Sequence, residues 1–120
     1  MAATQDLGQA GEQLAAEELK KKGYVILETN WRFVHKEIDI IARDRNDLVV
    51  VEVKTRTAPV LEMPEQAVNR TKQRFLIAAA NAYVRFRHIP LEVRFDVVYV
   101  VYERGVPVIR HIRNAFYPTL

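Results

Sequence analysis

Apolar and polar residues recur along the chain with two different periods, which predict two helices and several strands. The first helix is expected over residues 6–22, because Asp6 and Gln9 can form a capping box and Gly23 can take the left-handed conformation that ends a helix. The second helix is expected from residue 64 or 65 to about residue 87. Its apolar stripe is expected to contain Phe75, Ala79, Ala82, Tyr83 and Phe86.

Five segments are rich in β-branched and aromatic residues and are predicted to be strands. They are residues 24–30, 37–43, 48–56, 92–102 and 106–112. Residues 32–36 form a polar link, and the turn formers at 44–47 predict that the second and third strands pair as an antiparallel hairpin. Pro107 places the last strand at a sheet edge. The predicted element order is α-β-β-β-α-β-β.

Within this hairpin, Asp39 is expected to lie directly opposite Glu52. A turn of two or four residues centred on Asn46 pairs Arg43 with Leu48, and the same register pairs the two acids and places Glu37 opposite Lys54. Opposed carboxylates with Cβ atoms about 5 Å apart repel each other, so the pair requires a compensating cation.

Two cations fit this requirement, namely Lys54 and a divalent metal ion. Hard oxygen ligands, without Cys and without an HxH or HExxH pattern, favour Mg²⁺ or Mn²⁺ over zinc. Such an ion activates water and neutralises charge on a phosphoryl oxygen, while a lysine orients the water. Glu12 lies at the edge of the apolar side of the first helix and can point toward the sheet. The same pattern also fits a solvated, salt-bridged sheet face.

Composition excludes several other classes of protein. The chain has 120 residues with 49% hydrophobic and 28% charged residues, which is typical of one domain. It has neither Cys nor Ser, so disulfides, thiolate nucleophiles and Ser-His-Asp chemistry are excluded. Its four glycines form neither a Walker A loop nor a GxGxxG pattern. The longest apolar run, residues 97–102, is too short to span a membrane, and residues 1–8 show no secretory signal.

The charge is small but unevenly distributed. The net charge is +3, and the stretch from Arg70 to Arg94 is strongly basic, which suggests a side that faces a polyanion. Four basic residues are expected near the acidic pair, either as contacts to nucleic acid or as ordinary solvated side chains: Arg32, Arg56, Lys72 and Arg74. Trp31 can stack on a base or belong to a small core, and Asp96 is expected to pair with an arginine.

Four runs of the chain, extending over about residues 8–102, resemble the YraN-like family of small bacterial proteins, whose proposed activity is that of an endonuclease. The runs are GQAGEQLAAEELKKKGYVILETNWR, EIDIIARD, VVVEVKTR and RFDVVYV. Asp39, followed by Glu52-Val53-Lys54, resembles the motif of the PD-(D/E)xK nuclease superfamily, although Ile38 stands where the motif's name has Pro.

The resemblance implies a restriction-endonuclease-like αβββαβ core, similar to that of archaeal Holliday-junction resolvases. It also implies that Asp39 and Glu52 are metal ligands, that Lys54 is the catalytic lysine, and that Glu12 is the helix-borne acid of the site. We expect weak binding of Mg²⁺ or Mn²⁺, with the carbonyl of Val53 as a further ligand.

The sequence therefore predicts a cytoplasmic, single-domain α/β protein over residues 1–120, with a mixed sheet flanked by helices. Its expected activity is metal-dependent endonucleolytic hydrolysis of DNA, including branched or damaged DNA. Two alternatives stay open: a nucleic-acid-binding module without turnover, and a protein-interaction domain. The C-terminal run 115–118 fits either a cover for the core or contact with a partner subunit, so a homodimer also stays open.

Overall fold

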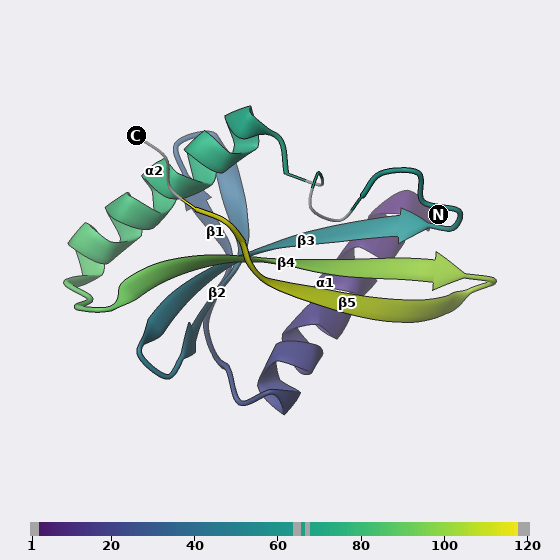
Figure 1. Cartoon of the computed structure of the whole chain (residues 1–120), viewed down its shortest axis with the longest axis horizontal. Coiled ribbons are helices and arrows are strands. Elements are labelled where there is room, and N and C mark those ends of the chain that lie inside the picture. The colour runs from purple at the N-terminus through teal and green to yellow at the C-terminus, as the bar shows by residue number, and fades with distance from the viewer. Residues whose placement is uncertain (1–2, 64–65, 67, 118–120) are drawn as a thin grey trace.

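The computed structural model describes residues 3–63, 66 and 68–117, and the side chains from residue 7 onward (Figure 1). Within this part of the chain, two helices and five strands follow the predicted order. Their bounds are α1 (Ala3–Lys21), β1 (Val25–Phe33), β2 (Lys36–Asp44), β3 (Asp47–Thr57), α2 (Arg70–Arg87), β4 (Glu92–Glu103) and β5 (Val106–Phe116).

The strands form one mixed sheet in the order β1-β2-β3-β4-β5. Only β3 and β4 are parallel among the described pairs, and the segment that connects them contains α2. The last strand, β5, lies at an edge of the sheet, as Pro107 predicted. The α/β class with a mixed sheet flanked by helices is therefore confirmed.

The two helices cover opposite faces of the sheet, as Figure 1 shows. On the α1 face, Ala15 and Leu19 pack against alternate residues of the central strands. On the α2 face, the buried helix residues are Leu76, Ala79, Ala80 and Tyr83. Because side chains alternate along a strand, the central strands supply apolar residues to both faces. Neither described helix is long and apolar enough to cross a membrane.

The register predicted for the β2–β3 hairpin is correct. Arg43 pairs with Leu48, and a two-residue turn at residues 45–46 joins the strands. The paired ladder ends at Ile40 and Val51, one position before Asp39 and Glu52. The two acids therefore lie at the end of the hairpin, beyond the last backbone pair.

Several predicted boundaries are wrong. Helix α1 begins at Ala3, so Asp6 lies inside the helix and does not form its N-cap. Helix α2 begins at Arg70, because the side chain of Asn69 caps it by accepting the Lys72 N–H at 2.9 Å. The first predicted start of this helix, residues 64 and 65, lies outside the described residues.

The apolar stripe predicted for α2 is also partly wrong. Phe86 is 75% exposed, whereas Leu76 and Ala80 are buried, so the helix is rotated relative to the predicted stripe. Strand β1 extends to Phe33, so the predicted polar link shortens to the turn at residues 34–35. At the C-terminus, Ala115 and Phe116 pack against the core; residue 118 lies outside the described part.

Candidate functional site

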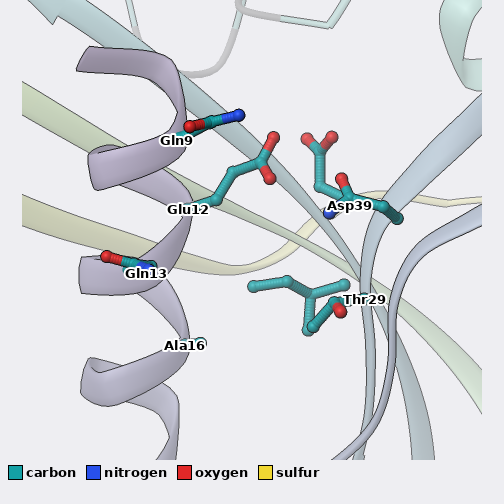
Figure 2. Close-up of a pocket in the computed structure, with 8 residues that line it drawn as sticks. Gln9, Glu12, Gln13, Ala16, Thr29 and Asp39 are labelled. Carbon is teal, nitrogen blue, oxygen red and sulfur yellow. The ribbon is translucent and has the colours of Figure 1, made fainter. Parts of the chain in front are cut away.

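A pocket of about 330 Å³ lies where α1 faces β1 and β2. Figure 2 shows the carboxyl groups of Glu12, on α1, and Asp39, on β2, directed toward each other across this pocket. The full lining is Gln9, Glu12, Gln13, Ala16, Thr29, Asn30, Asp39 and Ile40. The structure thus brings the predicted helix-borne acid to the predicted strand-borne acid.

The end of the β2–β3 ladder positions Asp39. The Val53 N–H donates to Asp39 Oδ2 at 2.8 Å. The paired ladder has already stopped at Ile40 and Val51, so this carboxyl takes the place that a backbone carbonyl of β2 would otherwise occupy. Asp39 is thereby fixed against the strand that carries Glu52.

The acids at this site repel one another. Burial, followed by the negative charge of Glu52, raises the pKa of Asp39 to about 8; the Val53 N–H acts in the opposite direction. The charge of Glu12 and a hydrogen bond shared with the Glu52 side chain contribute further to the increase. Burial also raises the pKa of Glu12, although a hydrogen bond from Asn30 lowers it. The three acids therefore concentrate negative charge at one place, and each disfavours ionisation of the others.

Glu52 is buried, with only 4% of the residue exposed. Two lysines neutralise its charge in part. Its Oε2 lies 3.4 Å from Lys54 Nζ and 3.6 Å from Lys72 Nζ. Its Oε1 is buried and has no hydrogen-bond partner among the described residues. A buried carboxylate oxygen without a donor is unfavourable, and so it identifies Glu52 as a group with an unused ligand position.

The donors present fit a hard divalent ion. Asp39 and Glu52 offer carboxylate oxygens, and Val53 lies beside both with its N–H already bound to Asp39. Over the described residues, no group of three or more His, Asp or Glu side chains is arranged to hold a metal ion, so at most two carboxylates are available as ligands. Mg²⁺ commonly uses one or two carboxylates, completed by water and substrate oxygens, so this donor set fits Mg²⁺ or Mn²⁺ better than zinc.

Gly11 allows α1 to approach the sheet closely enough to place Glu12. A Cβ atom at this position would overlap Thr55 Oγ1 and lie 3.4 Å from Thr55 Cβ, so a side chain here would push the helix away from β3. Gly11 and Asn30 were not among the residues predicted for the site. Asn30 has a φ of 52°, a conformation that Asn tolerates better than most residues, and this preference is its signal in the sequence.

Of the four predicted basic contacts, Lys72 is the one that the structure places beside the acids. Arg56 is bonded to Glu62 at 2.8 Å, whereas Arg32 is 66% exposed and lies 4.0 Å from Glu37. Arg74 is exposed on α2. The expected pairing of Glu37 with Lys54 is therefore wrong, because the ladder ends before it and Lys54 pairs with Glu52 instead.

The fold and site together define a small α/β protein with an acidic pocket at the end of its central hairpin. A model of the uncharacterised protein family UPF0102 matches residues 11–100, and the chain belongs to this family. It is 49% identical over 117 residues to a UPF0102 protein of Flavobacterium psychrophilum, covering 98% of each chain. A UPF0102 protein of Bacteroides thetaiotaomicron is 45% identical over 120 residues, covering 100% of this chain and 99% of the relative.

Proposed function

We propose that this protein is a metal-dependent endonuclease that hydrolyses DNA phosphodiester bonds. The observation that carries the proposal is the under-neutralised acid pair: Glu52 has a buried oxygen without a donor, and Asp39 has a raised pKa beside it. A lysine follows Glu52 by two residues and lies 3.4 Å from it. The resemblance of these positions to the PD-(D/E)xK motif, together with the matching element order, supports the same conclusion.

The mechanism assigns a separate task to each residue. Asp39, Glu52 and the Val53 carbonyl would hold Mg²⁺ or Mn²⁺, which would supply Lewis acidity at the site. Lys54 orients the attacking water or neutralises a phosphoryl oxygen, which stabilises the transition state more than the bound substrate.

The remaining groups complete the site. Glu12 faces Asp39 from α1 and can accept hydrogen bonds from water in the pocket. Lys72 is near enough to exchange its contact with Glu52 for a phosphate of the substrate. Arg70 and Arg74, exposed on α2, provide charge for the rest of the DNA backbone, in linear or branched form, whereas Arg94, at the far end of the basic stretch, is buried in its ion pairs and does not.

The decisive experiment compares cleavage of linear, flapped and four-way DNA with Mn²⁺ present. Asp39→Asn and Lys54→Ala should each lower the cleavage rate by at least about 100-fold, because each removes a group required in the transition state. Glu92→Gln and Lys20→Ala are matched controls at exposed positions and should cleave normally. All variants need identical purification, so that a contaminating nuclease would appear in every sample.

Each outcome assigns a different function. Full cleavage by Asp39→Asn or by Lys54→Ala contradicts the proposal. DNA binding by the wild type without cleavage on any substrate assigns a binding module, and neither binding nor cleavage assigns a protein-interaction domain. Calorimetry with Mn²⁺ gives an independent check, since the double variant Asp39→Asn, Glu52→Gln should lose the weak metal binding of the wild type.

A further inference from the structure

A group of aromatic rings lies between the β1–β2 turn and the first turns of α2. Trp31 and Phe33 stack with ring centroids 6.1 Å apart and planes 10° apart. Phe75, on α2, lies 6.1 Å from Phe33 at a tilt of 45°. The edge of this group rests on Tyr83, whose ring lies 5.1 Å from Trp31. We refer to Trp31, Phe33 and Phe75 as the aromatic cluster.

Two lysines lie over the aromatic cluster. Lys36 Nζ and Lys72 Nζ lie 5.7 Å and 5.5 Å from the centroid of the Phe75 ring, within the range of cation–π contacts. The same Lys72 Nζ lies 3.6 Å from Glu52 Oε2. The aromatic cluster is therefore continuous with the candidate site through a single side chain.

The aromatic cluster packs against the core on the α2 face but is not fully enclosed by it. Tyr83 beneath it is 2% exposed, whereas Trp31, Phe33 and Phe75 are each only half-buried. The turn beside the cluster is exposed, and Val34 in that turn is 65% exposed. Partly exposed rings with lysine charges beside them combine aromatic surface with a phosphate contact, which is the chemistry that proteins use for single-stranded nucleic acid.

We propose that the aromatic cluster, with Lys36 and Lys72, binds an unpaired segment of the substrate strand beside the bond that is cut. This inference rests on the proposed function and specifies its substrate class as DNA with a single-stranded arm at the site, such as a flap or fork. In a continuous duplex, neighbouring base pairs cover the faces of each base, so the aromatic cluster would have no base to contact. Phosphates of the unpaired arm pair with the two lysines.

Trp31 is the only tryptophan of the chain, so its fluorescence reports on the aromatic cluster directly. The full chain is titrated with a short oligothymidylate in the presence of a chelator, which prevents cleavage. Fluorescence should fall to a plateau, and added salt should weaken the binding. A duplex of equal length should bind at least about tenfold more weakly by the same signal, because its bases cannot stack on the rings. Equal quenching by the duplex, or no quenching by the oligothymidylate, overturns the inference.

Matched variants separate stacking from general stability. Phe33→Leu and Phe75→Leu keep an apolar side chain and should weaken oligothymidylate binding about tenfold. Phe86→Leu is the control, because this ring is 75% exposed on the same helix and outside the aromatic cluster. Lys36→Gln, at an exposed position, tests the cluster even if a Phe variant fails to fold. An equal loss in Phe86→Leu, or no loss in Lys36→Gln, contradicts the inference.

Cleavage assays with Mn²⁺ distinguish failure of this inference from failure of the proposed function. Equal cleavage of flapped and continuous duplex DNA, without quenching, would refute the inference and leave the nuclease in place. Quenching by oligothymidylate without cleavage of any DNA would refute the nuclease and leave single-strand binding in place. Preferred cleavage beside the unpaired arm, lost in Phe33→Leu, supports both.

Discussion

Two aspartates in the same sheet have opposite environments. Asp96, on β4, is fully enclosed and accepts hydrogen bonds from Arg94 Nε at 3.0 Å, His111 Nε2 at 2.7 Å and the Asn114 N–H at 3.0 Å. Tyr24 adds a fourth donor at 3.3 Å. Burial alone would raise the pKa of Asp96, but the hydrogen bonds from His111 and Arg94 hold it at about 2.

Asp39 has one donor, the Val53 N–H, and two acids near it. Its pKa is raised to about 8, first by burial and then by the charge of Glu52. The comparison shows that burial alone does not decide the pKa of an acid in this fold; the hydrogen-bond donors and the charge of the neighbouring groups decide its direction. An acid group left short of donors opposes folding, and its presence supports the proposed role of Asp39 in holding a cation.

The largest effect that tests this comparison is expected from Asp96→Asn. Loss of this charge leaves Arg94, which is 8% exposed, without its main partner, and removing one member of a buried ion pair costs about 3–5 kcal/mol in the free energy of unfolding. Urea unfolding at pH 7 measures the loss. Asp47→Asn is the control, because it also contacts Arg94, at 3.1 Å, from a position 37% exposed. A smaller loss in Asp96→Asn than in this control would contradict the assignment.

We expect Asp96→Asn also to change how the free energy of unfolding depends on pH in acid. Because the pKa of Asp96 is about 2 in the folded state, below its ordinary value of 3.8, its contribution is present above pH 3.8 and is lost as the pH falls toward 2. Asp96→Asn should therefore flatten the decline in the free energy of unfolding between these two pH values. If the decline is unchanged in the variant, groups other than Asp96 cause the loss of stability in acid.

The next effect concerns Gly11, which brings the third acid to Asp39. Gly11→Ala should lower the free energy of unfolding by about 1–3 kcal/mol, because the new methyl group overlaps Thr55 Oγ1. It should also slow cleavage by moving Glu12. Adding Thr55→Ala removes the overlapping atom and should restore most of both losses. A double variant no better than Gly11→Ala alone would show that the helix position is set by other contacts.

Local sequence signals predicted most of the fold. The element order and the hairpin register followed from alternation in the strands and from the turn formers at residues 44–47. The starts of both helices did not follow, because several polar residues near each start can act as a cap and tertiary packing chooses among them. The sequence predicted Phe86 on the buried face of α2, which is wrong. The spacing of apolar residues alone does not fix the rotation of a helix about its axis.

The site was predicted in its residues but not in its contacts. Asp39, Glu52 and Glu12 meet as expected, yet the end of the ladder beyond Ile40 and Val51 could not be derived from strand periodicity. That ending gives Asp39 a backbone donor and leaves Glu37 with Arg32 instead of Lys54. Lys72 was expected near the acidic pair as a contact to nucleic acid; its ion pair with Glu52 was not predicted, because it depends on how α2 packs, which has no local signal.

A smaller and opposite effect on stability is expected from Asp39→Asn. The amide oxygen can still accept the Val53 N–H, and the amide nitrogen can donate to the unpartnered Glu52 Oε1. Because the folded-state pKa of Asp39 is raised, wild-type stability is lost as the pH rises from 3.8 through about 8, and the variant has no such loss. Urea unfolding at pH 9 with a chelator should therefore show a gain of about 1 kcal/mol. A lower free energy of unfolding in the variant than in the wild type at pH 9 would show that the ionised pair of Asp39 and Glu52 is already stabilised.

The smallest effect is expected from Lys72→Ala, which tests whether the cations at the acidic site are exchangeable. The Lys72 side chain is 27% exposed and lies 3.6 Å from Glu52, which keeps Lys54 as a second partner. The loss in the free energy of unfolding should stay below about 1 kcal/mol, because Lys54 still partners the buried Glu52 and the Lys72 side chain is partly solvated. For DNA binding, the slope of log K against log salt should become shallower by roughly 0.9, because one phosphate contact fewer releases one counterion fewer.

Two variants serve as controls for Lys72→Ala. Arg74→Ala should change the slope equally but leave cleavage intact, and Arg104→Ala, in the exposed β4–β5 turn, should change neither the slope nor cleavage. A large loss of stability in Lys72→Ala, without any change in salt dependence, would show that this lysine is a fixed structural partner of Glu52, as Arg94 is of Asp96.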